Sequence, residues 1–202
     1  MSKMKITKVD VLAKTNFVSL YNIGYKNKVG NDKSWVVASR KSKEELENLY
    51  LENKKDEVDA VVLIAYHKTY EKLVIIKQFR VPINNYIYEL PAGLVDNNES
   101  IEVCTKRELK EETGLDLVEI NYEKSKMMMY PSPGMSNESI AFIYLTCDGE
   151  VSDKYLEEDE DIETVLVSRK RAREIINSNE NIDAKTYLVL ELFAQIGEKL
   201  FI

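Results

Sequence analysis

The chain has 202 residues, of which 44% are hydrophobic and 31% charged, and its formal net charge is −7. This length suits one domain with a buried core, or a core domain with a small appendage. The negative charge and the lack of a basic run argue against a nucleic-acid partner, because phosphate backbones attract basic surfaces.

The N-terminal lysines are not followed by an apolar stretch, so we expect no secretory signal. No segment approaches the roughly 18 consecutive apolar residues that a membrane helix needs. Cys104 and Cys147 have no metal-ligand spacing and are interpreted as small core residues. His67 is the one histidine, and it cannot form a zinc site or a catalytic triad alone. We therefore expect a cytoplasmic protein that makes no membrane contact.

The N-terminal third alternates short strand-like runs with turn signals. Runs at 17–21 and 35–39 are separated by Gly24 and by the Gly-Asn-Asp turn at 30–32. Residues 42–51 have the apolar spacing of a short helix.

Strands are then predicted at 60–66, 73–79 and 86–90, the first two joined as a hairpin. A loop over 91–98 precedes a predicted helix over about 100–113, and Gly114 occupies the usual position of a left-handed helix cap. The remaining predicted elements are strands at 126–130, 139–146 and 162–168, and helices at 169–177 and 184–200.

The helix over 100–113 carries an unusual group of carboxylates. Glu108 lies three residues before Glu111 and four before Glu112, so all three crowd one side of the helix. Like charges at these spacings destabilise a helix by roughly 0.2–0.5 kcal/mol per pair. A hard divalent cation would gather such oxygens, whereas the alternative is a solvated acidic face.

The spacing around these carboxylates is specific. Gly93 is followed after five residues by Glu99, and after seven more by the run Arg107-Glu108-Leu109-Lys110-Glu111-Glu112-Thr113-Gly114-Leu115. This resembles the Nudix box at all nine specified positions. The resemblance implies an α/β/α sandwich with a mixed sheet over 58–202. It also implies a β-rich region over 1–57 that mediates homodimerisation in relatives.

The resemblance implies roles for residues of the box. Glu108 and Glu112 would be the principal ligands of Mg²⁺ or Mn²⁺, with Glu111 as a further ligand and the backbone carbonyl of Ala92 as another. Arg107 is four residues before Glu111 and is interpreted as orienting the glutamates. Glu99, at the helix N-terminus, is either a structural cap or a metal contact. Gly93 is interpreted as allowing a sharp turn of the chain.

Segments outside the box resemble the ADP-ribose pyrophosphatase branch of the family. They are Gln-Phe-Arg ending at Arg80, Glu-Leu-Pro-Ala-Gly beginning at Glu89, and Tyr-Pro-Ser-Pro-Gly at 130–134 with Glu138 shortly after. The resemblance implies substrate contacts from Arg80, Glu89, Pro133, Gly134 and Glu138, and Arg80 has a planar fork suited to phosphate. Two alternatives remain open, a plain tight turn at 131–134 and a solvated arginine.

Two further candidates complete the predicted site. Arg40 is the cationic residue of the N-terminal region that we expect to contact the nucleotide. The acidic run at 157–163 resembles a family segment whose first glutamate serves as general base, a role that falls on Glu158, with Glu160 as second candidate. A solvated acidic loop is the alternative.

The sequence thus predicts a metal-dependent hydrolase of the diphosphate linkage of ADP-ribose, which it would cleave to AMP and ribose 5-phosphate, or of a similar nucleoside diphosphate sugar. The first alternative is a Nudix hydrolase of another nucleotide sugar such as GDP-mannose. The second is a non-catalytic nucleotide-binding module, for which a damaged box would be expected.

Overall fold

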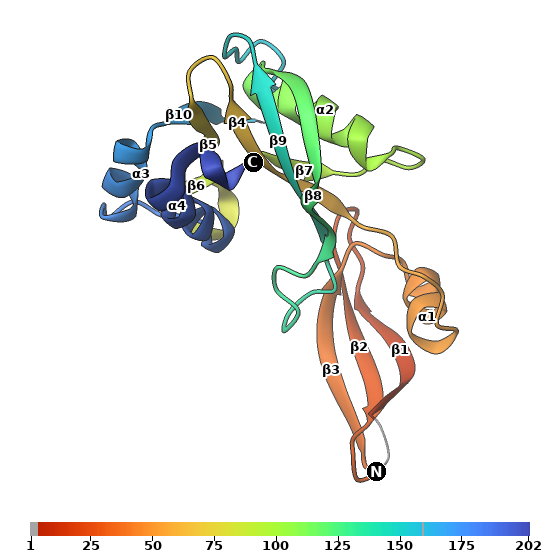
Figure 1. Cartoon of the computed structure of the whole chain (residues 1–202). Helices are drawn as coiled ribbons and strands as arrows, with labels where there is room; N and C mark the ends of the chain where they lie inside the picture. Colours follow the sequence, from red (N-terminus) through yellow and green to blue (C-terminus); the bar gives the residue numbers. More distant parts are fainter. Residues whose placement is uncertain (1–3, 159) are drawn as a thin grey trace. The chain divides into compact units, whose positions relative to one another are not determined.

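The computed structural model describes residues 4–158 and 160–202 (Figure 1). The chain divides into two compact units, Met1–Asp59 with Tyr130–Ile140, and Ala60–Met129 with Ala141–Ile202. The sequence placed a single division near residue 57. In the structure, the segment between the eighth and ninth strands also belongs to the first unit. The two units are described separately below.

The first unit is a three-stranded antiparallel sheet with one helix. The strands β1 (Lys5–Ala13), β2 (Ser19–Lys26) and β3 (Asp32–Ser39) lie in that order, and α1 (Lys43–Leu51) follows them. A capping box starts α1: the Ser42 hydroxyl accepts from the Glu45 amide, and the Glu45 carboxylate accepts from the Ser42 amide. The helix predicted over 42–51 is confirmed, whereas β1 was not predicted.

The core of this unit is small. Tyr21 and Ile23 alternate along β2, so both point to one face, where they pack with Val9 and with Leu46 of α1. The segment Tyr130–Ile140 joins the unit through the Ala38 amide, which donates to the Met135 carbonyl at 2.9 Å.

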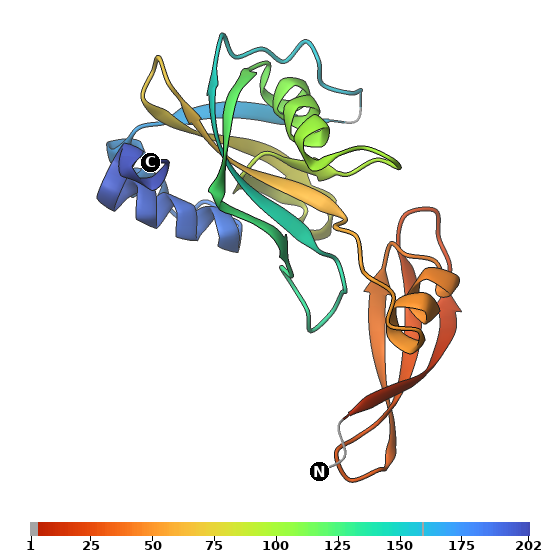
Figure 2. The ribbon, with the colours of Figure 1, turned by 45° about the vertical axis from the view of Figure 1, so that its right-hand side comes forward.

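The second unit is built on a larger sheet. Its strand order is β10-β5-β4-β9-β8, with β6 paired to β5 and β7 paired to β4. The strands are β4 (Ala60–His67), β5 (Lys72–Arg80), β6 (Asn85–Glu89), β7 (Ala92–Leu94), β8 (Asp116–Met129), β9 (Ile140–Asp148) and β10 (Ile162–Val167). Helix α2 (Ile101–Thr113) covers one face, and α3 (Arg169–Ile176) and α4 (Ala184–Ile196) cover the other (Figures 1 and 2). This is the expected α/β/α sandwich with a mixed sheet.

Strands β4 and β5 form the centre of the core. Every residue of β4 is buried, which explains its continuous apolar sequence. The predicted hairpin is confirmed, since His67 pairs with Lys72 at its closed end. The His67 ring is buried and its Nε2 lies 2.9 Å from the Gly149 carbonyl oxygen. Both cysteines are free and buried.

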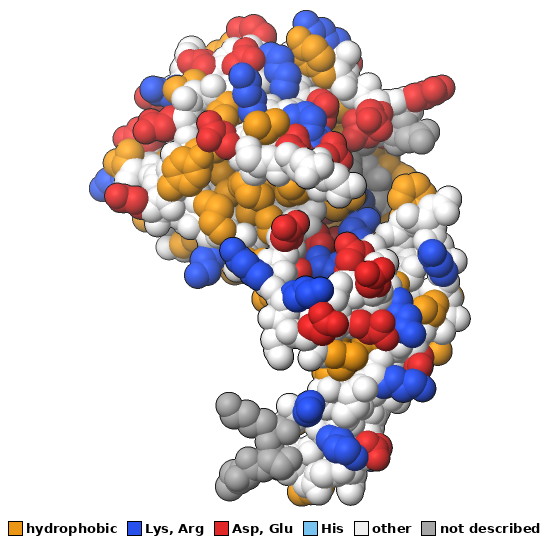
Figure 3. All heavy atoms as spheres, turned by 90° about the vertical axis from the view of Figure 1, so that its right-hand side faces the viewer, with side chains coloured by type: hydrophobic (Ala, Val, Ile, Leu, Met, Phe, Trp, Pro, Cys, Tyr) orange, Lys and Arg blue, Asp and Glu red, His pale blue; other side chains and the backbone are white. Residues whose placement is uncertain are grey.

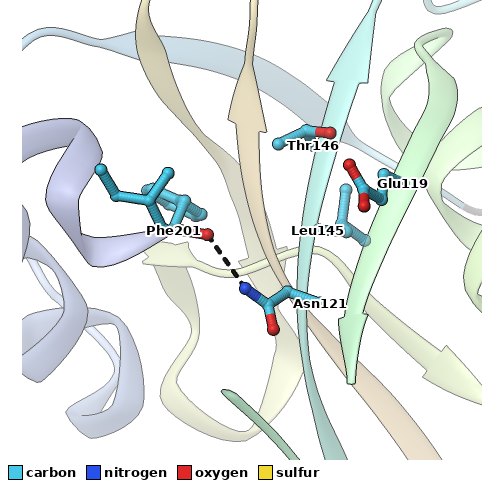
Figure 4. Close-up of a pocket in the computed structure, with 6 residues that line it drawn as sticks. Glu119, Asn121, Leu145, Thr146 and Phe201 are labelled. Atoms are coloured by element: carbon cyan, nitrogen blue, oxygen red, sulfur yellow. Dashed lines mark hydrogen bonds between the residues drawn. The ribbon is translucent and has the colours of Figure 1, made fainter. Parts of the chain in front are cut away.

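Strand β8 and the C-terminal helix differ from their predicted bounds. β8 spans 14 residues, far more than the predicted strand at 126–130, while α4 ends at Ile196 because Gly197 has a φ of +60°. The chain then turns toward β8, where the Asn121 side-chain amide donates to the Phe201 carbonyl at 3.1 Å. Figure 4 shows this contact at the edge of a cavity of about 220 Å³.

Acidic and basic side chains are interspersed on the face shown in Figure 3. Within the described residues, no helix is both long and apolar enough to cross a membrane.

Candidate active site

Helix α2 presents the box carboxylates, and both of its ends are well defined. The Ser100 hydroxyl accepts from the Val103 amide at 3.2 Å and starts the helix. At the other end Gly114 has a φ of +75°, and its amide donates to the Lys110 carbonyl at 2.9 Å. A Cβ on Gly114 would lie only 2.6 Å from the Ser152 amide nitrogen. The predicted left-handed cap is therefore confirmed.

Gly93 has a different role from the one inferred from the sequence. It lies within the short strand β7 and pairs with Val61, and its φ is not among the positive glycine values. A Cβ on Gly93 would lie 1.8 Å from Glu108 Cδ. The interpretation of a sharp turn was wrong: the position lacks a side chain because the Glu108 carboxylate lies against the backbone there.

Arg107 holds three of the box glutamates. Its Nε and Nη2 donate to the two Glu99 carboxylate oxygens at 3.0 and 2.9 Å. Its Nη1 donates to Glu108 at 2.7 Å and to Glu111 at 3.0 Å, and Nη2 also reaches the Leu94 carbonyl at 3.0 Å. This guanidinium holds the pKa of Glu99 down at about 2. The geometry agrees with an orienting role.

Glu108 and Glu112 are buried carboxylates, with exposed fractions of 9% and 5%. Burial raises the pKa of Glu108, against the opposing effect of Arg107. Burial also raises the pKa of Glu112 well above its usual value, and repulsion from Glu108 and Glu160 adds to the shift. The Ala92 amide donates to Glu112 at 2.9 Å and opposes it. The charge of buried Glu112 is thus disfavoured by its burial and by the charges of Glu108 and Glu160.

Arg80 and Glu89 meet on the hairpin of β5 and β6. Arg80 Nε donates to Glu89 Oε2 at 2.7 Å, with Arg80 about half exposed and Glu89 mostly buried. The positive charge of Arg80 partly opposes the rise in the pKa of Glu112 that burial causes.

The residues of the acidic run at 157–161 differ in their exposure and in their contacts. Glu158 is exposed and makes no hydrogen bond or ion pair with the described residues. Glu160 is partly buried, accepts from the Glu157 amide at 2.9 Å, and raises the pKa values of both Glu108 and Glu112. Asp159 lies outside the described residues. Of the two predicted base candidates, Glu160 is the one coupled to the buried carboxylates.

Sequence reasoning missed two residues of this region, Tyr86 and Asp161. The Tyr86 hydroxyl donates to the Asp161 carboxylate, and the Phe79 amide donates to the Asp161 carbonyl at 3.3 Å. Asp161 looked like one more acid of a solvated run, and Tyr86 like an ordinary strand residue. Only the pairing of β5 with both β6 and β10 brings them together.

The other predicted substrate contacts lie in the first unit. Arg40 Nε donates to Glu138 Oε1 at 3.0 Å, and Trp35 Nε1 donates to the Gly134 carbonyl at 3.2 Å. Pro133 lines an apolar cavity of about 510 Å³ on the sheet of that unit. Arg40 and Glu138 thus form a pair within this unit, and the turn with Pro133 and Gly134 is attached to β3.

The chemistry of the donor set fits a hard divalent cation. The available ligands are carboxylate oxygens, which Mg²⁺ prefers, and the repulsion of the Glu112 carboxylate by Glu108 and Glu160 is what a cation would relieve. As placed in the described part of the chain, no three such side chains converge closely enough to hold an ion. Glu108 and Glu111 are turned toward Arg107 instead.

Comparison with known proteins agrees with this geometry. The NUDIX domain profile matches residues 55–188. An ADP-ribose pyrophosphatase of Bacillus subtilis is 34% identical over 131 residues, covering 64% of this chain and 68% of the relative. A GDP-mannose pyrophosphatase of Salmonella arizonae is 36% identical over 143 residues, covering 67% and 73%.

A solved structure titled as an ADP compounds hydrolase shares the fold. It superposes with a TM-score of 0.70 over 95% of this chain and 92% of that one, at 17% sequence identity. Together with the intact box and its placement on α2, the profile match shows that this chain belongs to the Nudix hydrolase family.

Proposed function

We propose that the protein hydrolyses the diphosphate linkage of ADP-ribose, releasing AMP and ribose 5-phosphate, in a reaction that depends on Mg²⁺ or Mn²⁺. The observation that carries this proposal is the intact box on α2, which buries the Glu108 and Glu112 carboxylates against Gly93 and the Ala92 amide, with Arg107 holding Glu108 and Glu111. Negative charges gathered and partly buried in this way suit a site that binds a cation and, through it, phosphate oxygens.

Residues of this chain divide the work. The cation would be held by the carboxylates of Glu108, Glu111 and Glu112 and by the Ala92 carbonyl. Arg107 would keep the Glu108 and Glu111 carboxylates oriented. A bound divalent ion would neutralise phosphate oxygens and make the attacking water more acidic. Arg80 would bind the diphosphate, with Glu89 fixing the direction of its fork.

Glu160 is our choice as general base. Water adds across one P–O bond of the diphosphate, the bridging oxygen leaves with one product, and the Glu160 carboxylate accepts a proton from the attacking water. Its coupling to Glu108 and Glu112 supports Glu160 over Glu158, which is exposed and has no partner among the described residues.

The first unit also carries candidate residues for contacts to the nucleotide. They are Arg40, which is paired with Glu138, and the turn with Pro133 and Gly134, which is joined to Trp35 of β3. We also propose that the protein is a homodimer formed through this unit. Large apolar side chains are exposed on it, including Phe17 at 80%, Trp35 at 56% and Val36 at 52%. Analytical ultracentrifugation of the full chain and of a Val36→Lys variant would test the dimer.

A substrate panel tests the activity. Wild-type protein with Mg²⁺ should release AMP from ADP-ribose, while Glu112→Gln should be at least a hundredfold slower. Glu123→Gln, an exposed control on β8, should retain wild-type activity. Binding of ADP-ribose without any metal-dependent turnover would contradict the proposal and indicate a non-catalytic module.

GDP-mannose is the second candidate substrate, because a GDP-mannose pyrophosphatase is among the similar proteins. Release of GMP from GDP-mannose with a kcat/KM at least tenfold above that for ADP-ribose would replace the first candidate.

A further inference from the structure

We propose that Tyr86, acting through Asp161, is a positioning residue for the carboxylate of Glu160. The inference rests on the proposed function, in which Glu160 receives a proton, and it adds two residues that lie outside the box.

Asp161 is the point where the acidic run is attached to the sheet. It directly precedes β10, whose first residue Ile162 pairs with Gln78 of β5. The hydrogen bond from the Phe79 amide to the Asp161 carbonyl, at 3.3 Å, extends that pairing by one residue. The backbone of Asp161 is therefore held by β5, and Glu160 is the next residue outward.

Tyr86 fixes the side chain of the same residue. It pairs with Phe79 across the β5–β6 hairpin, and the two rings pack edge to face with centroids 5.6 Å apart. This packing directs the Tyr86 hydroxyl, which donates to the Asp161 carboxylate. Asp161 is thus held through its main chain by one strand and through its side chain by the neighbouring strand.

Strand β10 is also joined to α2, the helix that carries Glu108 and Glu112. The Thr164 hydroxyl of β10 donates to the Glu112 carbonyl at 3.1 Å, so β10 is joined to the end of α2 three residues past Asp161. With Asp161 fixed, Glu160 lies one residue outward from Asp161, and the strand that follows is joined to α2, the helix that carries Glu108 and Glu112. Loss of the Tyr86 hydroxyl would free the Asp161 side chain and widen the range of positions open to Glu160.

The alternative is that the Tyr86–Asp161 hydrogen bond is a surface contact with a structural role only. Tyr187 offers a matched comparison, because it is 41% exposed against 42% for Tyr86 and its hydroxyl also donates to a carboxylate, that of Glu191 in α4. The two tyrosines differ in what their partners adjoin: Asp161 adjoins Glu160, whereas Glu191 lies within a helix away from the box.

The test is steady-state hydrolysis of ADP-ribose by full-length variants. We expect Tyr86→Phe to lower kcat by roughly 5- to 10-fold, the value of one lost hydrogen bond, with KM changed less than twofold. Tyr187→Phe should match wild type. Asp161→Ala should resemble Tyr86→Phe, while Asp161→Asn, which keeps an acceptor oxygen, should recover most of the loss.

The double variant Tyr86→Phe/Asp161→Ala should be no slower than Asp161→Ala alone, because both remove the same contact. In a Glu160→Gln background, Tyr86→Phe should have no further effect on kcat. An equal fold-loss in that background, a loss confined to KM, or activity equal to that of Tyr187→Phe would overturn the inference while leaving the proposed function intact. Absence of hydrolysis by the wild-type protein would refute both.

Discussion

The Glu108 carboxylate occupies the space that a side chain on Gly93 would need, since a Cβ there would lie 1.8 Å from Glu108 Cδ. The first glycine of the box and the glutamate that follows Arg107 are therefore in direct packing contact. Strand β7 brings Gly93 beside α2, and the missing side chain lets a buried carboxylate lie flat on the backbone.

Gly93→Ala should consequently displace Glu108. We expect hydrolysis to fall at least a hundredfold. The free energy of unfolding should fall by only about 1 kcal/mol, the low end of the cost of overpacking, because the atoms that must move are the end of one side chain. In a Glu108→Ala background the same change at Gly93 should cost less than about 0.5 kcal/mol, because the clashing group is gone. Urea denaturation of the four proteins measures this; an equal cost in both backgrounds would show that Glu108 is not the obstacle.

Arg107→Lys tests whether the planar fork is needed. Lysine keeps the charge but cannot contact Glu99, Glu108 and Glu111 together. We expect a loss of roughly 2–4 kcal/mol in unfolding free energy, because buried glutamates lose their donors. Arg171→Lys is the control, since Arg171 pairs with Glu174 on an exposed helix face and should cost under about 0.5 kcal/mol. Similar losses for the two variants would contradict the network.

The Glu99–Arg107 pair predicts a defined acid sensitivity. Arg107 lowers the folded-state pKa of Glu99 from 4.5 to about 2, so the pair stabilises the fold above pH 4.5 and this contribution is lost as the pH falls toward 2. Wild type should exceed Glu99→Gln by roughly 1.5–3 kcal/mol at pH 7, and the gap should narrow by pH 3. Chemical denaturation at pH 7, 5 and 3 provides the measurement, and a gap independent of pH would be inconsistent with the pair.

Much of the second unit could be predicted because its signals are local. The buried strands β4 and β5 have continuous apolar sequences, and α2 has a serine cap, a glycine cap and a motif of fixed spacing. The bounds of β8 could not be predicted in the same way. Its residues are exposed or half-exposed and include lysine, glutamate and asparagine, so only pairing with β9 defines it as a strand.

The residues of the candidate site also differ in whether local sequence could predict them. The spacing within one helix predicted Glu108, Glu111 and Glu112, whose shared face depends on helix geometry alone. The contact between Tyr86 and Asp161 spans 75 residues and depends on which strands flank β5, which local sequence does not report. The role of Gly93 was misread for the same reason, since the group that excludes a side chain lies 15 residues away.

Cation binding should be visible in stability as well as in turnover. The charges of Glu108 and Glu160 both disfavour the buried charge of Glu112, so a divalent ion that binds the folded state should raise Tm. At about ten times its Kd, Mg²⁺ should add about 1.4 kcal/mol, or about 3–5 °C for a chain of this size.

Without metal, Glu112→Gln should not lower the melting temperature. Glutamine keeps an acceptor for the Ala92 amide but removes a buried negative charge, so without metal this variant should melt at or above the wild-type temperature. With Mg²⁺ the wild type should have the higher melting temperature, because only the wild type is stabilised by the cation. Differential scanning fluorimetry with EDTA and with Mg²⁺ tests the crossing, with Glu123→Gln as the control that should follow wild type. Equal Mg²⁺ shifts in Glu112→Gln and wild type would place the cation elsewhere.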